Sequence, residues 1–460
     1  MKCSNKIYFR PYIPYNRPEE RGLPFVCRIA PFENGFDIEW LDNSDPDGVH
    51  TLVCSKRESG EKAAELVLTG KTGRVEGLDT DTDYVFYVEA ASGKRSADRL
   101  VRTGRIPEGT TVVNYLHPDD GIYDFSGKYL CSPSLVRTPK GRLIAGMDVF
   151  ASNYPQNLTI HFVSEDNGKS WKYLNDIFGF YWSTLFTHRG KLYMIGMTTE
   201  YGNLHITRSD DDGETWATPT DLLFGANVLC YNGGVHRAPM HTVEYDGRVY
   251  TTCEYGCWKK GSHLPLVISF ATGDDPMIAE SWNVTEVMKF EGRWKEESGG
   301  KQGDTIEGNV IKAPDGKLLN ILRYRNGKYL VTEINQKDLD APLTYVGIED
   351  APVTSSMFRI LKKGEKYLLI TNHATEEALK VETHTYRNVL SVYESDDIKN
   401  WKFVRDIVNY EKESAKTTGF QYPTAFLEGD DAYLLIRSAF NNAHNFHDSN
   451  HMLFTKITLK

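Results

Sequence analysis

Several apolar segments of this chain carry single ionisable side chains that could do chemistry together. Glu307 stands in Ile306–Val310 and Tyr422 stands in Gly419–Ala425, while Arg323 and Arg387 have similar surroundings. A carboxylate is costly to bury without a task. A tyrosine hydroxyl, with a pKa of about 10, is a weak nucleophile until a carboxylate takes its proton. Arginines can hold a substrate carboxylate by charge-assisted, bidentate hydrogen bonds. These residue types would suit covalent catalysis on an acidic substrate.

Other polar and aromatic residues stand near the ends of apolar segments and are candidates for binding. His236 and Glu254 belong to neighbouring segments, and Arg437 is followed by the polar stretch that contains His447. Trp182 could stack on the apolar face of a sugar ring. The predicted substrate-binding residues are Arg323, Arg387, Arg437, His236, Trp182, Glu254, His447 and Gln421.

From about residue 106 the chain becomes repetitive, which indicates how these residues are positioned. Short apolar strands separated by turns, with an acidic loop ending in Trp, recur at intervals of about 40–60 residues, a period typical of β-propellers. The repeats lie near residues 131–177, 181–224, 236–290, 305–350, 355–409 and 420–460. We therefore predict six blades, with Thr111–Tyr115 supplying the outer strand that closes the ring. A seventh blade would need short, atypical strands.

Two acidic loops match the pattern Ser-x-Asp-x-Gly-x-x-Trp in full. One loop runs from Ser164 to Trp171 and the other from Ser209 to Trp216, and a degenerate copy lies at Ser395–Trp401. Ser and Asp accept hydrogen bonds from turn N–H groups, Gly permits a positive φ, and Trp packs between sheets. The pattern resembles the Asp-box of the sialidase-like propellers, which indicates the fold and not the reaction.

The resemblance to sialidases also implies roles for residues around the pore. Glu307 and Arg323, which are 16 residues apart, match the Glu and Arg of the sialidase fourth-blade hairpin. Arg387 matches a substrate-binding arginine before the fifth Asp-box. Tyr422 opens the last blade, where sialidases place the nucleophilic tyrosine. The resemblance thus implies that Glu307 activates Tyr422, an exception to glycosidase chemistry with two carboxylates.

Two features depart from the sialidase pattern. The first-blade strand reads Cys131-Ser132-Pro133-Ser134-Leu135-Val136 and lacks the arginine that sialidases have there. The loop Val149–Asn157 lacks the catalytic acid/base Asp, for which Asp148 is the nearest substitute. We therefore predict Tyr422, Glu307 and Asp148 as the catalytic residues, acting on an acidic sugar other than an ordinary sialoside.

The region before the repeats has a different pattern, with alternation in Phe36–Trp40 and a Tyr-x-x-x-Val-x-Ala motif from Tyr84. It resembles a fibronectin type III module, with Trp40 in the core and Tyr84 as the tyrosine corner. The predicted fold is an all-β, six-bladed sialidase-like propeller preceded by this small sandwich. The predicted boundaries are 1–23 for an N-terminal segment, 24–105 for the module and 106–460 for the propeller.

Composition narrows the partners. The net charge is −10 and no basic block stands out, so we expect no nucleic-acid partner. No apolar run is long enough to span a membrane. The seven cysteines have irregular spacing and are expected to be mostly buried thiols, and no motif predicts a metal or other cofactor. Met1–Asn5 lacks a hydrophobic signal core. By analogy with the family, we expect a secreted or periplasmic bacterial protein that acts as a monomer.

Three functions fit these residues. The first is a glycoside hydrolase that removes a sialic-acid-like or uronic acid residue from an oligosaccharide or polysaccharide. The second is a polysaccharide lyase, in which His236 and Tyr422 abstract a proton next to a uronate carboxyl group that Arg323 neutralises. The third is a glycan-binding propeller without catalysis. The many titratable groups favour an enzyme.

Overall fold

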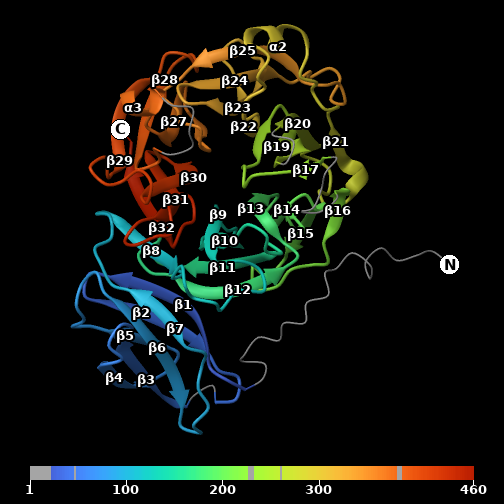
Figure 1. Cartoon of the computed structure of the whole chain (residues 1–460). Coiled ribbons are helices and arrows are strands. Elements are labelled where there is room, and N and C mark those ends of the chain that lie inside the picture. Colours follow the sequence, from blue (N-terminus) through green and yellow to red (C-terminus); the bar gives the residue numbers. More distant parts are fainter. Residues whose placement is uncertain (1–21, 46–47, 226–232, 259–261, 381–385, 460) are drawn as a thin grey trace, which may run out of the picture.

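The computed structural model describes residues 22–45, 48–225, 233–258, 262–380 and 386–459. Within these ranges the chain forms two N-terminal sheets, of three and four strands, and a ring of six sheets of four or five strands (Figure 1). The helices that lie wholly within the described residues are η3 (Ala279–Ser281), α2 (Gly292–Glu297) and α3 (Glu376–Leu379). None of these helices has the length and apolar character needed to cross a bilayer. The predicted all-β class is confirmed.

The N-terminal sheets contain seven strands. One sheet has the order β1-β2-β5, from β1 (Phe25–Phe32), β2 (Gly35–Leu41) and β5 (Thr72–Val75). The other has the order β4-β3-β6-β7, from β3 (Val49–Lys56), β4 (Lys62–Thr69), β6 (Asp83–Ala90) and β7 (Arg99–Arg102). Burial alternates along β6, as expected for a strand with one face on a core. Trp40 and Tyr84 are fully buried between the sheets.

The ring is built from antiparallel sheets that follow one another in sequence. The first sheet contains β9 (Tyr129–Arg137), β10 (Leu143–Phe150), β11 (Leu158–Ser164) and β12 (Lys172–Phe178). The second contains β13 (Tyr181–His188), β14 (Lys191–Met197), β15 (Leu204–Ser209) and β16 (Thr220–Leu223). The third contains β17 (Gly234–His236), β18 (Val243–Tyr245), β19 (Arg248–Cys257), β20 (Ser262–Ala271) and β21 (Trp282–Val284). The fourth contains β22 (Ile306–Lys312), β23 (Leu318–Arg325), β24 (Lys328–Glu333) and β25 (Thr344–Asp350). The fifth contains β26 (Arg359–Lys363), β27 (Lys366–Asn372), β28 (Val389–Ser395) and β29 (Lys402–Asn409). The sixth has the order β30-β31-β32-β8, from β30 (Gly419–Glu428), β31 (Asp431–Ala439), β32 (His451–Thr458) and β8 (Thr110–Tyr115).

The ring closes through strands from opposite ends of the propeller sequence. β8 pairs antiparallel with β32, so that His451 lies opposite Tyr115. This confirms the prediction that residues 111–115 complete the last sheet. The described part of the chain thus contains six propeller sheets.

The Asp-box loops are stabilised by the contacts that their sequence predicts. Gly168 N donates to Ser164 Oγ at 2.8 Å, and Ser170 N donates to Asp166 Oδ1 at 2.9 Å. Gly168 has a φ of 88°, and the Trp171 ring packs against Phe454 of the neighbouring sheet. The loop from Ser209 has the same hydrogen bonds.

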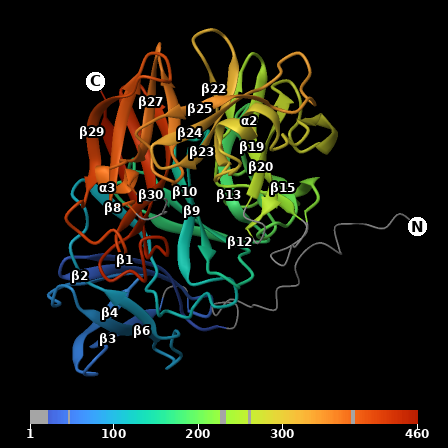
Figure 2. The ribbon, with the colours of Figure 1, turned by 45° about the horizontal axis from the view of Figure 1, so that its top comes forward.

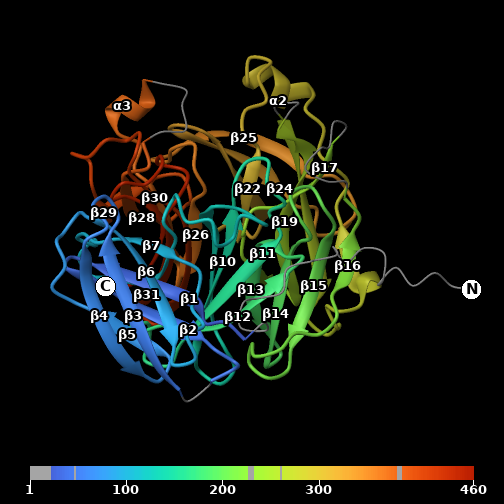
Figure 3. The same cartoon turned by 60° about the horizontal axis from the view of Figure 1, so that its bottom comes forward.

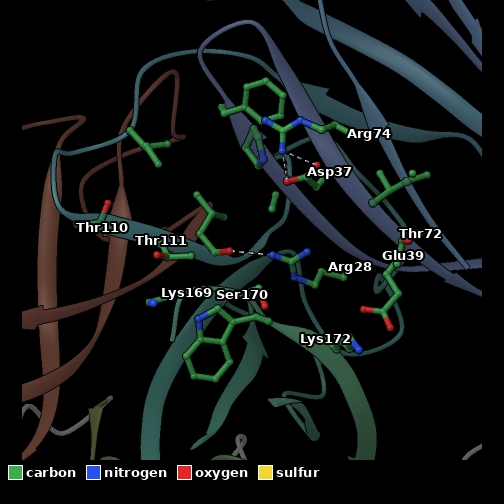
Figure 4. Close-up of a pocket in the computed structure, with 18 of the residues that line it drawn as sticks. Arg28, Asp37, Glu39, Thr72, Arg74, Thr110, Thr111, Lys169, Ser170 and Lys172 are labelled. Atoms are coloured by element: carbon green, nitrogen blue, oxygen red, sulfur yellow. Dashed lines mark hydrogen bonds and ion pairs between the residues drawn. The ribbon is translucent and has the colours of Figure 1, made fainter. Parts of the chain in front are cut away.

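The N-terminal sheets lie beside the ring, next to β8 and β12 (Figures 1, 2 and 3). Arg28 of β1 donates from Nε to Val113 O at 2.8 Å and from Nη2 to Val112 O at 3.0 Å. Glu39 of β2 accepts a hydrogen bond from Tyr173 N at 2.8 Å. Arg28, Glu39 and Val112 line a 630 Å³ cavity at the junction (Figure 4). One buried cluster joins apolar residues of both regions, so the N-terminal sheets are packed against the ring rather than tethered to it.

Candidate active site

A repeated backbone irregularity turns four side chains toward the pore. The innermost strands of the first, second, fourth and sixth sheets each contain a register shift, at Ser132, Trp182, Glu307 and Tyr422. Each of these residues has a positive φ, between 49° and 60°. Non-glycine residues rarely adopt this conformation, and β-bulges near active sites often use it to re-aim a side chain. All four residues line one cavity of 390 Å³.

Tyr422 and Glu307 are in direct contact in the wall of this cavity. Tyr422 Oη donates to Glu307 Oε1 at 2.5 Å. Glu307 is 2% exposed, and its backbone N–H donates to Glu254 Oε1 at 2.9 Å. Burial raises the pKa of Tyr422 to about 12, and the charge of Glu307 acts in the same direction. The hydroxyl is therefore protonated at neutral pH, and Glu307 is placed to accept its proton.

Three arginines surround the Tyr422 ring. Arg323 Nη1 lies 3.1 Å from Glu307 Oε1 and 3.3 Å from Tyr422 Oη. The guanidinium carbons of Arg387 and Arg437 lie 5.8 and 5.2 Å from the ring centroid. Such cations stabilise a developing phenolate. The charges of all three act to lower the pKa of Tyr422 and offset part of the effect of burial.

The three guanidinium groups differ in their access to a ligand. Arg323 also binds Asp304 Oδ2 at 3.0 Å, and Arg387 binds Gln421 Oε1 and Ser355 O. Burial acts to lower the pKa of Arg323, but nearby negative charges raise it overall. Burial, with the charge of Arg323, lowers that of Arg387 to about 10. Of the three, only Arg437 is among the residues that line the cavity.

His236 and Glu254 form a buried pair on the third sheet. His236 Nδ1 lies 2.8 Å from Glu254 Oε2, and both side chains are almost inaccessible to solvent. Burial lowers the pKa of His236 to about 3 and raises that of Glu254 to about 8, which favours the uncharged form of both. His236 lines the cavity, whereas Glu254 lies behind it and also holds the Glu307 backbone. The pair positions the catalytic candidate and presents an imidazole to a ligand.

Asp148 is not brought together with Tyr422 and Glu307. It is fully buried and does not line the cavity. Its oxygens accept hydrogen bonds from Thr159 Oγ1 at 2.5 Å, Ser183 Oγ at 3.1 Å and Trp182 N at 2.6 Å. Burial raises its pKa to about 7 in spite of these bonds. In this position the carboxyl group supports the bulge at Trp182 rather than facing a ligand.

Some of the remaining predicted binding residues line the cavity, and others are buried behind it. Trp182 and His447 line the cavity, and the Trp182 ring lies 4.4 Å from that of His236. Arg437 Nη2 donates to His447 O at 2.6 Å. Gln421 is fully buried and donates from Nε2 to Phe446 O at 2.7 Å, so it ties β30 to the loop before β32.

The cavity also contains residues that no sequence motif predicts. Glu200, Tyr201 and Gln156 come from the loops after β10 and β14, and Trp258 follows β19. Trp258 is 46% exposed and its backbone N–H donates to Tyr201 Oη at 2.7 Å. These residues belong to no recognised motif. Their only sequence signal is their place after the second strand of a repeat, at the end where the inner strand begins.

The cysteines and metal-binding residues add no further centre in the described ranges. Cys27, Cys54, Cys131, Cys253 and Cys257 are buried thiols outside any disulfide. Cys3 and Cys230 lie outside the described residues. No group of three or more His, Cys, Asp and Glu side chains in the described part of the chain could hold a metal ion.

Comparison with solved structures shows that this chain shares the fold of a sialidase, an α-L-arabinanase and an α-L-arabinofuranosidase. The NanB sialidase of Streptococcus pneumoniae is 11% identical over 95% of this chain and 92% of that chain, with TM-scores of 0.51 and 0.49 for two of its structures. An α-L-arabinanase of Penicillium chrysogenum, solved with arabinobiose, is 11% identical, with a TM-score of 0.50, over 77% of this chain and 98% of that chain. An α-L-arabinofuranosidase of Fusarium graminearum is 11% identical, with a TM-score of 0.51, over 76% and 98%. At this identity the likeness shows the fold alone.

The sequence itself matches a family model. The BNR repeat-like domain model matches residues 186–436, and the chain belongs to this family. None of the curated proteins matches this chain. The predicted relationship to Asp-box propellers is thus confirmed at the level of the fold and the repeat.

Proposed function

We propose that this protein is a retaining glycoside hydrolase that releases an acidic sugar from a glycan. The observation that carries the proposal is the 2.5 Å hydrogen bond from Tyr422 to Glu307 in the cavity wall. Glu307 takes the phenolic proton while Tyr422 Oη attacks the anomeric carbon. Arg323, Arg387 and Arg437 stabilise the negative charge that develops on the phenol oxygen.

The positive charge of Arg437 supports an acidic substrate. Arg437 lies in the cavity wall, beside the Tyr422 ring and His447, which lines the same cavity. A guanidinium group in this position can hold a sugar carboxylate next to the attacked carbon. Trp182 and Trp258 offer aromatic faces on which a sugar ring can stack.

A glycan digest tests the reaction. Sialosides, uronate-rich polysaccharides and arabino-oligosaccharides would be incubated with the wild type and with Glu307→Gln, and the products weighed by mass spectrometry. We expect a released acidic sugar, heavier by one water than its glycosyl residue, and a loss of at least about 100-fold in the variant. Release of arabinose alone would overturn the acidic substrate. No product from any glycan would overturn the hydrolase.

The His236–Glu254 pair keeps a lyase as the second candidate. An uncharged imidazole that faces the cavity could abstract a proton next to a uronate carboxyl group. A lyase product would be unsaturated and absorb ultraviolet light, and it would be lost in His236→Gln. Binding without any product would instead identify a glycan-binding propeller.

We further propose that residues 24–105 are a fibronectin type III-like module and that the propeller occupies 106–460. The strand orders β1-β2-β5 and β4-β3-β6-β7 support this assignment. So does the tyrosine corner, in which Asp79 N donates to Tyr84 Oη at 3.0 Å. The packing of β1 against β8 gives the module a structural role in stabilising the closing strand.

A further inference from the structure

We propose that Glu200 is the proton donor to the leaving sugar, and that Trp258 and Gln156 position its carboxyl group. The inference rests on the proposed function, because it names a partner for Tyr422 and Glu307 in the same reaction. Neither Glu200 nor Trp258 belongs to a sequence motif. Their contacts in the cavity carry the assignment.

The first support is the position of Glu200 in the ring. Glu200 lies in the loop between β14 and β15 of the second blade, Glu307 lies in the fourth sheet and Tyr422 in the sixth, and all three line the same cavity. Residues from every second blade approach the pore from well-separated directions. A retaining glycosidase needs a nucleophile on one side of the anomeric carbon and an acid beside the leaving oxygen. Glu200 is the described carboxylic acid in this cavity other than Glu307.

The second support is the set of contacts around the carboxyl group. Gln156 Nε2 donates to Glu200 Oε2 at 3.5 Å, and Trp258 lies in the same wall. None of the ion pairs in the described residues joins Glu200 to a basic side chain. Burial raises the pKa of Glu200 to about 7, and hydrogen bonds from Trp258 and Gln156 offset only part of that effect. A half-buried carboxyl group with such neighbours holds a proton near neutral pH and can release it to a substrate.

The third support is the contrast with Asp148, the acid expected from the sequence. Asp148 lies near the end of β10, the second strand of its blade, and Glu200 lies in the loop that follows β14, the second strand of the next blade. Asp148 accepts hydrogen bonds from Thr159, Trp182 and Ser183, among others, and lies outside the cavity. Glu200 lies in the cavity wall, where a leaving oxygen can reach it. The blade-two loop therefore supplies the acid that the blade-one loop lacks.

The proposed hydrolysis takes place in two steps. In the first step the Tyr422 Oη–C1 bond forms, the bond from C1 to the leaving oxygen breaks, the Glu200 proton passes to that oxygen and the Tyr422 proton passes to Glu307. In the second step the Glu200 carboxylate takes a proton from water, whose oxygen bonds to C1 while the C1–Tyr422 bond breaks. Glu307 then returns its proton to the phenol oxygen. The products are the free sugar and the shortened glycan.

The test separates proton donation from folding and from substrate binding. Glu200→Gln would be assayed with the oligosaccharide that the wild type cleaves and with the 2,4-dinitrophenyl glycoside of the released sugar, which needs no proton on its leaving group. Glu165→Gln, an exposed glutamate on the first Asp-box loop, is the matched control. We expect a loss of about 10²–10⁴-fold on the oligosaccharide. On the aryl glycoside we expect a loss of less than about 10-fold in the first step.

Two further readouts sharpen the assignment. The basic limb of the wild-type pH profile of kcat/KM should disappear in Glu200→Gln. Added azide should restore turnover of the aryl glycoside and yield a glycosyl azide that retains the anomeric configuration. Trp258→Phe should shift the basic limb without removing it, because it changes only a neighbour of the acid.

The outcomes distinguish this inference from the proposed function. Oligosaccharide cleavage by Glu200→Gln within about threefold of the wild type would overturn the role of Glu200 while leaving Tyr422 and Glu307 in place. Equal losses on both substrates, with no rescue by azide, would also overturn it. If the wild type cleaves no glycan, the proposed function fails, and the assignment of Glu200 fails with it.

Discussion

The carboxylates of the outer rim and those near the pore have opposite environments. On the rim, burial acts to raise the pKa of Asp211, but hydrogen bonds from Thr215 and Ser209 outweigh it and lower the pKa to about 2. Near the pore, burial raises the pKa to about 7 for Asp148 and Glu200 and to about 8 for Glu254. The same functional group is thus stabilised as an anion in one region and as a neutral acid in the other.

This difference follows from what each region does. A rim aspartate accepts several N–H and O–H donors from its own turn while solvent remains close, and this stabilises a loop. Asp148, Glu200 and Glu254 lose solvent, and their hydrogen bonds offset only part of the effect of burial, so these three groups tend to keep their protons near neutral pH. Substitutions in the pore should therefore change the chemistry, whereas substitutions on the rim should change only stability.

Tyr422→Phe should have the largest effect, because it removes the hydroxyl that we propose as the nucleophile and leaves the ring in place. We expect turnover to fall at least about 10³-fold, with little change in the midpoint of thermal unfolding. Turnover is measured by release of the sugar that the wild type produces. A fluorinated analogue of that sugar should also increase the mass of the wild-type peptide that contains Tyr422, and it should not do so in the variant.

Tyr433→Phe is the matched control for this prediction. Tyr433 lies in the same sheet, but its ring stacks on Phe426, outside the cavity. Its loss should leave turnover within about twofold of the wild type. Equal activity of Tyr422→Phe and the wild type would show that the pore does not use this hydroxyl.

Asp148→Asn should have a pH-dependent effect on stability. The folded pKa of Asp148 lies above the unfolded value of 3.8, at about 7. Between these values the folded state binds more protons, so the wild type loses stability as the pH rises through this range. The amide that replaces the carboxyl group does not titrate, so the free energy of unfolding of the wild type relative to the variant should fall by about 2–4 kcal/mol between pH 4 and pH 7.

Urea unfolding at pH 4.5, 6 and 7.5 would measure this difference. A relative stability that stays constant or rises with pH would contradict the buried, proton-holding environment of Asp148. Because the two proteins differ at one site, other titrating groups cancel in the comparison.

The rim could be predicted from the sequence, whereas the cavity could be predicted only in part. The eight residues from Ser164 to Trp171 form a loop by local hydrogen bonds, so their pattern is visible in a short stretch of chain. Resemblance to sialidases also gave the pair Glu307 and Tyr422, which the structure brings into contact. The closing strand β8 was predicted because the last repeat lacked a strand.

The part of the cavity that the sequence did not predict depends on contacts between residues far apart in the chain. Glu200 reaches the pore only because its loop follows the second strand of a blade, and Glu254 supports Glu307 across two sheets. Positive φ angles at Trp182 and Ser132 aim side chains into the pore, yet neither residue type signals such a conformation. Asp148 was the carboxylic acid nearest to the loop in which the acid was expected, but its side chain accepts hydrogen bonds from Thr159, Trp182 and Ser183 and lies outside the cavity.

Asp211→Ala should have a smaller effect, limited to stability. It removes acceptors for Ser209 Oγ and Thr215 N, each at 2.8 Å, which should cost about 1–2 kcal/mol. Because the folded pKa lies below the unfolded value, this stability is present above about pH 4 and is lost as the pH falls toward 2. Turnover at pH 7 should equal that of the wild type. A change in kcat would contradict the prediction that rim substitutions change only stability.

Tyr84→Phe should have the smallest effect. It tests whether a substitution in the N-terminal module, like one on the rim, changes only the stability of the protein. The phenol oxygen of Tyr84 accepts the Asp79 N–H at 3.0 Å, and its loss should cost about 1 kcal/mol. Tyr87→Phe, on the same strand beside Arg95, is the control that leaves this corner intact. Since one buried cluster joins the module to the ring, the loss should lower a single unfolding transition of the whole chain. A separate early transition in Tyr84→Phe, with the main transition unchanged, would show that the module unfolds independently and does not stabilise β8.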